Sequence, residues 1–358
     1  MNNKVVITGG HPTPAEAVIE EITKEGDWQI FYFGRRHAQE GQKDLSFEHQ
    51  QITKMENVTF VHINTGRLQR RLTRRTIPSL MKVPPGLTVS FAQLLKIKPK
   101  LIIGFGGYLS TPVILAGYLL GIPSISHEQT RTLGLGNRLN WPWIKKLAVS
   151  FPELVKSNKT VLTGNPISQS AFNPQVPSDW PIKIFVEKSK KPILFVTGGG
   201  TGSQIINQVV GLALPELRKQ FTIVHQTGTN LFSAHQTDDY LPVDFIDSRY
   251  FGWLMQHSTL MISRSGANTV WKMASLKIPG ILIPLPKTAG NEAIKNALFL
   301  ESLGLGKIVH QEKLSTESLL SAIEQFKPQF GQYPDWWSKT NPTKAAKKVW
   351  QLAKEQIK

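Results

Sequence analysis

The stretch ITGGHPTPAEAV, residues 7–18, joins an apolar run to a helical one through a pair of glycines. Residues 5–7 predict the end of a buried strand, and residues 15–19 predict the first turns of a helix. Glycines at such a corner let the backbone approach a ligand closely, and the N-terminus of the helix attracts an anion. The corner therefore predicts either an anion-binding loop or a tight turn without a ligand.

The same alternation of strand and helix patterns continues along the chain. The expected strands are residues 5–8, 28–33, 58–63, 101–104, 124–127, 146–150 and 161–164, then 193–197, 222–226, 244–246, 260–263, 280–284 and 307–309. Helical patterns lie between most of them, as at 204–219, 267–276 and 292–302. Alternating elements of this kind predict an α/β protein with parallel sheets covered by helices. We expect two Rossmann-like domains facing an interdomain cleft, with ligands at the carboxyl ends of the strands.

The length of 358 residues favours two domains over one. A proline-containing segment with a Lys-Ser-Lys-Lys run separates the two series of strands. The expected divisions are an N-terminal domain at 1–168, a linker and lead-in at 169–191, a C-terminal domain at 192–335 and a closing helix at 336–358.

Composition narrows the classes of function. The chain has no cysteine, which excludes disulfides and thiolate metal sites. No apolar run approaches the length of a spanning helix, and the N-terminus has no signal-peptide pattern, so we expect a cytosolic protein. The formal net charge of +17 suits an anionic partner, which is a nucleic acid, a phosphorylated substrate or the inner leaflet of a membrane. A generally basic proteome is the alternative explanation.

Four glycine-bearing corners follow expected strands, at residues 9–11, 104–108, 198–202 and 264–267. None is a Walker motif, because no Gly-Lys-Ser/Thr follows. No acidic residue ends the strand at Gln226, where an NAD-binding fold would use one for the ribose. The corners therefore favour diphosphate recognition by backbone amides, helix dipoles and Arg264 over a dehydrogenase.

Several ordered motifs resemble those of the MurG family over roughly residues 4–310. They are GFGGYLSTPVILAG, IPSISHEQT, LTGNPIS, VTGGGTGSQIINQ, VHQTG, FID, ISRSGANTVWKMASLKIPGILIPLP and NEAIKNA. The resemblance implies the GT-B fold and an inverting transfer of N-acetylglucosamine from UDP-GlcNAc to the C4 hydroxyl of undecaprenyl-diphosphoryl-N-acetylmuramyl-pentapeptide. It also implies a peripheral protein at the cytoplasmic face of the cell membrane, with no cofactor and no metal bound by the protein.

The resemblance assigns roles to residues of this chain. His11 becomes the candidate general base for the acceptor hydroxyl, with Glu128 the next candidate, because the hydroxyl is a poor nucleophile until its proton leaves. A local hydrogen bond at the helix N-terminus is the alternative for His11, and a buried structural role is the alternative for His127 and Glu128. The residues expected to bind the acceptor are Gly9, Gly10, Gly106, Gly107, Tyr108, Ser110, His127 and Gln129.

A second group is expected to bind the donor. Phe245 and Ile246 would hold uracil, Arg264 would approach the diphosphate, and Asn296 would bind the C4 hydroxyl of the sugar and so separate gluco from galacto donors. The full set is Thr130, Gly199, Gly200, Thr201, Gly202, Phe245, Ile246, Arg264, Ser265, Gly266, Ala267, Thr269, Lys272, Glu292 and Asn296.

The chain also departs from the family pattern. Its first glycine loop is three residues short, so the acceptor diphosphate cradle is expected to be smaller. The other departures are Thr130 for Asn, Ser168 for Arg, Gly200 for Ser, Lys272 for the ribose-binding Glu, and Glu292-Ala293 for a His-Gln or Gln-Gln pair. Donor recognition is therefore expected to differ from the family pattern in several places.

A basic segment predicts contact with the anionic inner membrane surface. Five arginines at helical spacing, beside apolar residues, would bind acidic lipids; they are Arg67, Arg70, Arg71, Arg74 and Arg75. The alternative is a solvated surface helix.

For the function of the whole chain, two alternatives remain. One is a related enzyme with another nucleotide sugar or with a lipid acceptor such as diacylglycerol, and the other is a catalytically weak scaffold among cell-wall assembly proteins. Nucleic acid is not an expected partner, because no recognition module is present.

Overall fold

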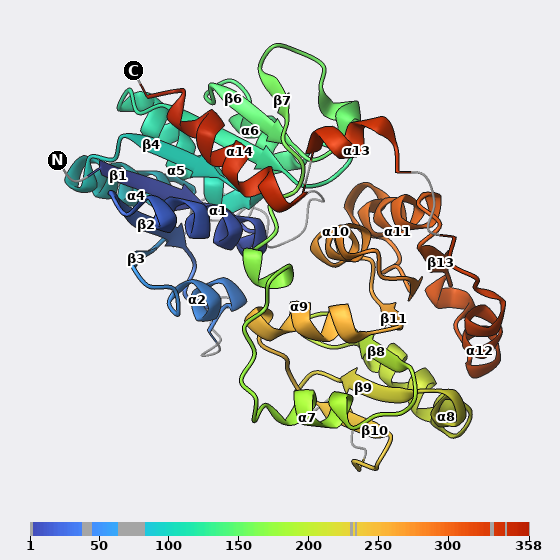
Figure 1. Ribbon diagram of the computed structural model, residues 1–358. Coiled ribbons are helices and arrows are strands. Elements are labelled where there is room, and N and C mark those ends of the chain that lie inside the picture. The colour runs from blue at the N-terminus through green and yellow to red at the C-terminus, as the bar shows by residue number, and fades with distance from the viewer. Residues whose placement is uncertain are drawn as a thin grey trace. The chain divides into compact units, whose positions relative to one another are not determined.

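The computed structural model describes residues 3–37, 45–63, 83–229, 232, 235–329, 333–340 and 342–357. The chain divides into two compact units, drawn in Figure 1: unit 1 is Met1–Ser168 with Asp335–Lys358, and unit 2 is Gln169–Pro334. Residues 169–191, expected as a linker and lead-in, are part of unit 2 and contain a helix. The C-terminal segment holds two helices and returns to unit 1.

Unit 1 is built on a parallel sheet, which has seven strands among the described residues. The strands are β1 (Asn3–Thr8), β2 (Trp28–Gly34), β3 (Val58–His62), β4 (Leu101–Gly104), β5 (Ser124–Glu128), β6 (Lys146–Val149) and β7 (Thr160–Leu162). Their order is β3-β2-β1-β4-β5-β6-β7, so the chain reverses direction across the sheet at β1. The carboxyl ends of β1 and β4 are therefore neighbours, and ligands of such sheets bind where the strand order reverses.

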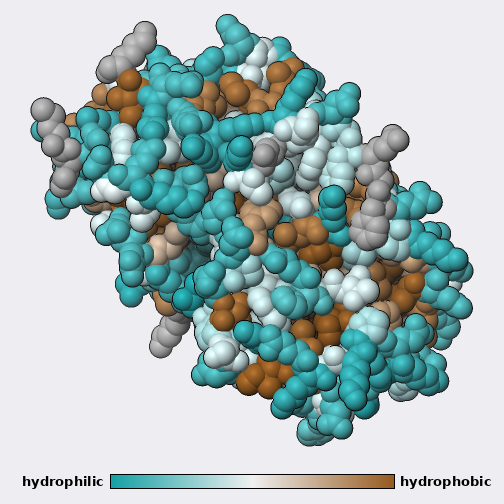
Figure 2. Space-filling model, in the orientation of Figure 1, coloured by the Kyte–Doolittle hydropathy of each residue, from teal (hydrophilic) through white to brown (hydrophobic). Residues whose placement is uncertain are grey.

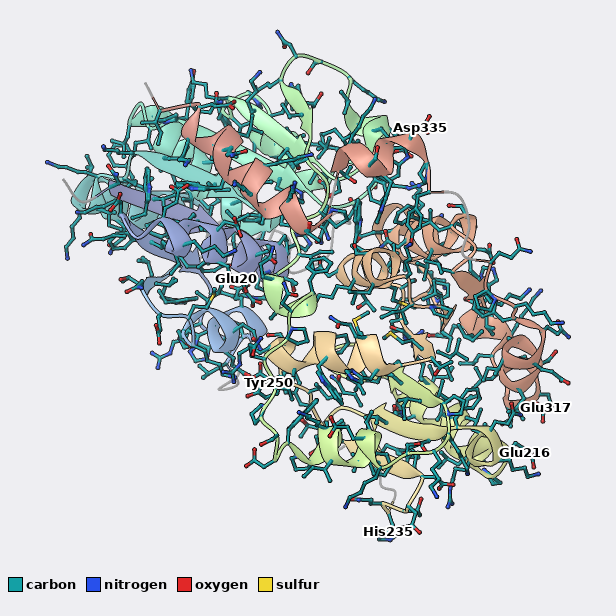
Figure 3. The ribbon with its side chains drawn as sticks, viewed as in Figure 1. Glu20, Glu216, His235, Tyr250, Glu317 and Asp335 are labelled. Atoms are coloured by element: carbon teal, nitrogen blue, oxygen red, sulfur yellow. The ribbon has the colours of Figure 1, made fainter. Side chains whose placement is uncertain are left out.

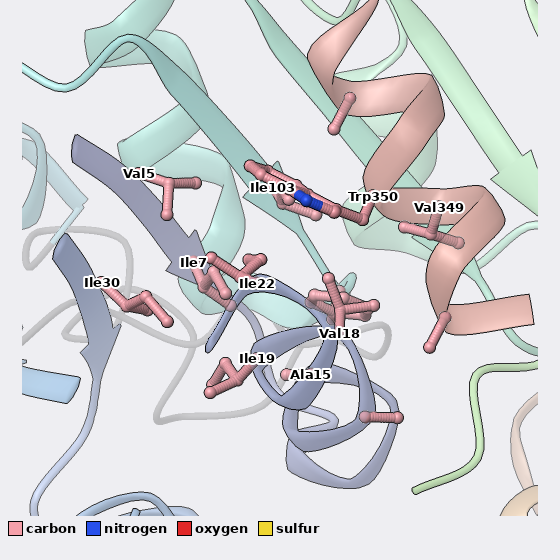
Figure 4. Packing of buried hydrophobic residues seen from close by; sticks show 14 of the residues in the cluster. Val5, Ile7, Ala15, Val18, Ile19, Ile22, Ile30, Ile103, Val349 and Trp350 are labelled. Carbon is pink, nitrogen blue, oxygen red and sulfur yellow. The ribbon is translucent and has the colours of Figure 1, made fainter. Parts of the chain in front are cut away.

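Helices cover both faces of this sheet. They are α1 (Pro12–Glu25), α2 (Phe47–Ile52), α4 (Val83–Ile97), α5 (Gly107–Leu119), α6 (Leu135–Asn140), α13 (Asp335–Thr340) and α14 (Pro342–Lys354), with a 3-10 turn at Pro152–Leu154. Val5 and Ile7 pack with Trp350 of α14 in the core shown in Figure 4, whereas Val6 points to the other face. This alternation is the two-residue period of a strand buried on both sides.

Unit 2 has a second parallel sheet, with six strands in the part of the chain that is described. They are β8 (Ile193–Thr197), β9 (Thr222–Gln226), β10 (Tyr240–Val243), β11 (Leu260–Ser263), β12 (Gly280–Leu282) and β13 (Gly306–Ile308), in the order β10-β9-β8-β11-β12-β13. The strand expected at 244–246 is wrong, because the chain pairs at Tyr240–Val243 instead. Pro242 lies in this strand, and an edge strand tolerates proline because one side of its backbone needs no partner.

The helices of unit 2 lie between its strands in the chain. They are α7 (Pro181–Glu187), α8 (Gln204–Gln220), α9 (Ser248–His257), α10 (Ala267–Leu276), α11 (Glu292–Ser302) and α12 (Thr316–Gln325), with 3-10 turns at Gln169–Ala171, Ala289–Asn291 and Gln311–Lys313. The inner sides of α8 and α12 close one core with Leu194 and Ile262 of the sheet. Glu216 of α8 and Glu317 of α12 point away from the sheet (Figure 3).

Figure 2 shows hydrophilic residues over much of the face in view, with hydrophobic patches between them. Within the described ranges no helix is both long and apolar enough to cross a bilayer. Of the described lysines and arginines, Lys272 alone is buried, so the basic charge of these residues lies almost wholly at the surface.

Candidate active site

Two glycine loops interlock at the carboxyl ends of β1 and β4. The N–H of Gly10 donates to the carbonyl oxygen of Gly106 at 3.1 Å, and the N–H of Phe105 donates to the oxygen of Thr8 at 2.7 Å. Gly9 has φ +145°, and a Cβ there would lie 2.8 Å from the backbone of Phe105. Glycine is therefore required at position 9 for backbone-to-backbone packing. The N–H of Gly10 is already hydrogen-bonded within the protein, so it is not free to bind a ligand.

His11 stands between this loop and helix α1. Its Nδ1 lies 2.9 Å from the carbonyl oxygen of Phe105. A carbonyl oxygen accepts hydrogen bonds only, so Nδ1 carries the proton in the neutral ring and Nε2 keeps its lone pair. The side chain makes no capping bond to α1 and is half-buried. This is the tautomer that a general base needs, because Nε2 can accept a proton.

His127 and Glu128, at the end of β5, are buried. His127 is 2% exposed, and its Nε2 lies 3.2 Å from the carbonyl oxygen of Gly164 and 3.3 Å from Oγ of Ser150. Burial lowers the pKa of His127 to about 4. The neutral ring thus joins β5 to neighbouring segments of the sheet, and this geometry favours the structural alternative for His127.

The carboxylate of Glu128 organises the loop that follows it. It accepts hydrogen bonds from the N–H and the hydroxyl of Thr130 at 3.2 and 2.8 Å, from Gly134 N at 2.8 Å and from Asn137 Nδ2 at 3.0 Å. Glu128 and Thr130 are 4% and 6% exposed. Their polar atoms serve the fold of this loop, so a buried structural role also describes Glu128 better than that of a base.

Tyr108 and Ser110 lie on the first turn of α5 but differ in accessibility. Ser110 is fully buried, donates to the oxygen of Gly107 at 3.0 Å and accepts from Nδ2 of Asn140 at 2.9 Å. Tyr108 is half-buried, and its hydroxyl accepts from Nη1 of Arg35 at 3.4 Å. Tyr108 is therefore the member of this pair that a ligand can reach. Gln129 is 5% exposed.

The glycine loop after β8 is closed by its own hydrogen bonds. The N–H of Gly199 donates to Oγ1 of Thr197 at 3.0 Å, and its carbonyl oxygen accepts from Gly202 N at 3.0 Å and from Nε2 of Gln226 at 3.3 Å. Gly202 has φ +76°, and a Cβ there would lie 2.2 Å from the oxygen of Thr227. The exposed part of this loop is Gly200 and Thr201, which Gly202 and Ser203 separate from the first residue of α8.

Arg264 links the end of β11 to this loop. Its Nη2 donates to Oγ of Ser203 at 2.8 Å, and Nη1 donates to the carbonyl oxygen of Ile283 at 3.1 Å. Partial burial lowers the pKa of the guanidinium without a nearby carboxylate as a cause. The arginine therefore places a positive charge beside the start of α8.

Ser265 and Asn296 connect the starts of α10 and α11. Oγ of Ser265 donates to the oxygen of Ala293 at 2.7 Å, and Nδ2 of Asn296 donates to the oxygen of Ser265 at 3.1 Å. Asn296 is 2% exposed. Gly266 precedes α10, and Glu292 is the first residue of α11. These contacts fix the two helix starts relative to one another.

Comparison with known proteins places the chain in a family. The glycosyltransferase family 28 N-terminal domain matches residues 6–149, and the C-terminal domain of that family matches residues 193–351. A UDP-N-acetylglucosamine–N-acetylmuramyl-(pentapeptide) pyrophosphoryl-undecaprenol N-acetylglucosamine transferase of Clostridium novyi is 32% identical over 332 residues, 90% of each chain. The enzyme of that name from Clostridium botulinum (strain Langeland) is 30% identical over 365 residues, 99% of each chain. The chain belongs to the MurG family.

Solved structures support the GT-B architecture expected from the family resemblance. Acinetobacter baumannii MurG is 22% identical with a TM-score of 0.69, covering 99% of both chains. The glycotransferase of kitacinnamycin has a TM-score of 0.71 at 11% identity, with complete coverage of both chains. Together with the two parallel sheets, these similarities confirm two Rossmann-like domains of the GT-B type.

The two residues expected to hold the uracil ring of the donor differ in exposure. Phe245 is 43% exposed, in the loop between β10 and α9, whereas Ile246 is 3% exposed. Asp247 follows and begins α9 by accepting from the N–H of Arg249 at 3.0 Å. An aromatic ring is thus presented at the surface by a capped helix start.

The side chain of Lys272 would either turn toward the donor diphosphate or point into water, and the structure bears on the second alternative. It is 9% exposed, and its Nζ lies 5.5 Å from the centre of the Phe251 ring, within the range of a cation–π contact. A side chain that points into water is therefore wrong for this residue. Its neighbours on α10 include Ala267, which is 5% exposed, and Thr269, which is half-buried.

The arginines expected to contact the membrane cannot be compared with the structure. Arg67, Arg70, Arg71, Arg74 and Arg75 lie outside the described residues. Ser168, at the position of a family arginine, donates its hydroxyl to Glu20 on α1, labelled in Figure 3. The sequence motifs did not indicate Arg35 or the role of Gln226, although Arg35 directly follows β2 and Gln226 ends β9, both at the carboxyl edge of a sheet.

Proposed function

We propose that the chain transfers N-acetylglucosamine from UDP-GlcNAc to the C4 hydroxyl of undecaprenyl-diphosphate-linked N-acetylmuramyl-pentapeptide, forming the lipid-linked disaccharide precursor of peptidoglycan. Family membership supports the reaction class. The observation that carries the assignment to this chain is the His11–Phe105 contact at 2.9 Å, which leaves Nε2 of a half-buried histidine able to accept a proton.

The reaction follows from that tautomer. The acceptor C4 oxygen attacks C1 of the donor sugar while its proton passes to Nε2 of His11. The bond between C1 and the diphosphate oxygen breaks, and UDP leaves with both electrons of that bond. Attack opposite the leaving group inverts the anomeric centre. The hydrogen bond to Phe105 stabilises the imidazolium that forms, because Nδ1–H becomes a charge-assisted donor.

Unit 2 supplies groups suited to the leaving diphosphate. Gly200 and Thr201 are exposed in the loop that leads into α8, and the N-terminus of a helix favours an anion. Arg264 holds a positive charge beside the same helix start through Ser203. We assign these residues to binding of the donor diphosphate, and the exposed ring of Phe245 to binding of uracil. Charge stabilisation of the leaving group lowers the barrier to transfer.

The acceptor places the reaction at a membrane. Its undecaprenyl chain stays in the bilayer, so the protein works as a peripheral protein at the cytoplasmic face. The net charge of +17 suits an anionic leaflet. Contact through the arginines at 67–75 stays a prediction, and vesicle co-sedimentation tests it: Glu in place of three of them, or high salt, should release the protein.

A transfer assay tests the proposed function. Purified protein is incubated with radiolabelled UDP-GlcNAc and a short-chain analogue of the acceptor, and parallel reactions use other sugar nucleotides or diacylglycerol. We expect transfer with UDP-GlcNAc and the diphosphate-linked acceptor, and an inverted product. Transfer only with another donor or with diacylglycerol would overturn the substrate assignment. No transfer in any reaction would favour a scaffold.

A further inference from the structure

Arg35 is fixed by its backbone at the carboxyl end of β2. Its N–H donates to Oε1 of Glu48 at 2.6 Å, and its carbonyl oxygen accepts from Oγ of Ser46 at 2.6 Å. Glu48 is 3% exposed. The preceding residue is Gly34, where a Cβ would lie 3.2 Å from the Glu48 carboxylate and 2.8 Å from the Tyr32 ring. A buried carboxylate thus holds the main chain of Arg35 in place.

The guanidinium of Arg35 lies beside the start of α5 and is partly open to solvent. Its Nη1 is 3.4 Å from the hydroxyl of Tyr108, and its Nε is 3.8 Å from Glu48, while 39% of the side chain is exposed. A guanidinium has five N–H donors. Nε is buried, and within the described part of the chain Tyr108 is the hydrogen-bond partner of this side chain, so Nη1 and Nη2 keep N–H groups that can bind an anion.

The first glycine loop, residues 9–11, offers few free N–H groups to an anion. The N–H of Gly10 already bonds to Gly106. The first and third residues of α1 are Pro12 and Pro14, which have no N–H, so the start of this helix offers an anion little more than Thr13. A diphosphate that approaches His11 therefore needs a positive charge from elsewhere on this edge.

We propose that Arg35 binds the diphosphate of the lipid-linked acceptor and so places the acceptor C4 hydroxyl at His11. This inference rests on the proposed function and names the residue that supplies the charge. β2 lies next to β1 in the sheet, with Phe33 paired to Thr8, so Arg35 and His11 follow adjacent strand ends. A fork of N–H groups at a fixed position suits the oxygens of a phosphate.

The electrostatics of Glu48 agree with this arrangement. Burial raises the pKa of Glu48, while the Arg35 N–H, the Arg35 charge and the charge of protonated His11 each lower it. The three groups therefore share one environment. The pKa of Tyr32 is raised by burial and, to a smaller extent, by the charge of Glu48, and its hydroxyl donates to the oxygen of Gly9 at 3.1 Å.

Steady-state kinetics test the proposal with two matched variants. Arg35→Met keeps the apolar stem and removes the charge, whereas Arg36→Met removes the neighbouring exposed arginine, whose N–H bonds to Nδ1 of His62 instead. We expect Arg35→Met to raise the KM for the acceptor about 10- to 100-fold, the range of a lost charge-assisted hydrogen bond, and to leave the KM for UDP-GlcNAc unchanged. An equal loss in Arg36→Met, or a loss confined to the donor KM, would overturn the proposal.

A binding measurement separates this proposal from the proposed function. Calorimetry with geranyl diphosphate and with geraniol needs no turnover. The wild type should bind the diphosphate more tightly than the alcohol, Arg35→Met should lose most of that difference, Arg35→Lys should keep part of it, and Arg36→Met should keep it. Binding that depends on Arg35 in a protein that transfers no sugar would overturn the proposed function alone. Equal diphosphate affinity in wild type and in both Arg35 variants, each folded by circular dichroism, would overturn the role of Arg35.

Discussion

Nδ1 of His11 lies 2.9 Å from the carbonyl oxygen of Phe105, a residue that closes the neighbouring glycine loop. The contact joins the two loops that follow β1 and β4 and fixes one tautomer of the imidazole. The same backbone segment is packed against Gly9, so the carbonyl cannot turn away without moving the first loop. The orientation of the His11 ring is therefore fixed by the edge of the sheet.

Removal of this imidazole should reduce turnover. We expect His11→Ala to lower kcat by about 10²- to 10⁴-fold, the usual contribution of a general base, with little change in donor affinity. His310→Ala, which removes an exposed histidine of unit 2, is the control and should keep the wild-type kcat. Steady-state kinetics with both substrates give the answer. A wild-type kcat in His11→Ala would place the base elsewhere.

Gln226 should act on the donor through the glycine loop. It is 1% exposed, and its Nε2 donates to Gly199 at 3.3 Å, which helps to hold the loop whose exposed tip is Gly200 and Thr201. Gln226→Leu removes that bond at similar volume, so we expect the KM for UDP-GlcNAc to rise about 10-fold at an unchanged acceptor KM.

A second glutamine provides the control for this measurement. Nε2 of Gln256 donates to the backbone oxygens of Ala171 and Phe172 at 2.8 and 3.0 Å, away from the glycine loop. Gln256→Leu therefore loses comparable hydrogen bonds in the same unit and should keep the wild-type donor KM. If both variants raise this KM equally, a general loss of order in unit 2 explains the effect, and Gln226 has no special role.

Acid should destabilise both units. Burial lowers the pKa of His127 in unit 1 and of His225 in unit 2 to about 4. Between pH 6.5 and 4 the unfolded chain binds more protons than the folded one, so the free energy of unfolding falls as the pH falls. The full loss is on the order of 3 kcal/mol for each histidine, from about 1.4 kcal/mol per pKa unit.

Urea unfolding at pH 7.5, 6 and 5 checks this slope. Nδ1 of His225 lies 3.0 Å from the hydroxyl of Tyr240, and Nε2 lies 3.1 Å from Oδ1 of Asn207. Glutamine cannot titrate in this range, so His225→Gln should flatten the pH dependence of unit 2 while lowering its stability at pH 7.5. The exposed His310→Gln should leave the slope unchanged. A wild type that is equally stable at pH 7.5 and 5 would show that neither histidine stays neutral on folding.

The strand pattern predicted much of the fold because burial on both faces produces clear apolar runs. The expected bounds of β4, β8, β9 and β11 agree with the structure, as do those of α10 and α11. The exception is β10, where Pro242 interrupts the apolar pattern and the Phe-Ile pair beyond it resembles a strand. Proline is tolerated there only because β10 is an edge strand, and strand order is not visible in a local pattern.

The site was less predictable than the fold. The glycine motifs indicated which loops follow the strands, but the exposure of each side chain in these loops depends on residues that are distant in the chain. His127 is buried against Gly164 and Ser150, and Ser110 against Asn140. Arg35 was missed because its significance lies in contacts with Glu48 and Tyr108, 13 and 73 residues away. Such tertiary hydrogen bonds leave no periodic signal in the sequence.

Lys272 is a buried cation on α10, at the position where the family pattern has a ribose-binding glutamate. A carboxylate at this position could accept hydrogen bonds from both ribose hydroxyls, whereas an ammonium group only donates. Nζ lies 5.5 Å from the Phe251 ring centre, and the side chain is 9% exposed, so the ammonium is held among protein groups. We therefore expect the wild type to bind dUDP almost as well as UDP, and UDP much better than uridine. Calorimetric titration of the three ligands measures both differences.

A charge-reversed variant and a matched control complete this test. Lys272→Glu should restore a preference for UDP over dUDP while weakening the attraction for the diphosphate. Lys277→Glu, one residue beyond the end of α10, is the matched control and should change neither. A wild-type protein that strongly rejects dUDP would show that another residue recognises the ribose, and the role given to Lys272 would then be wrong.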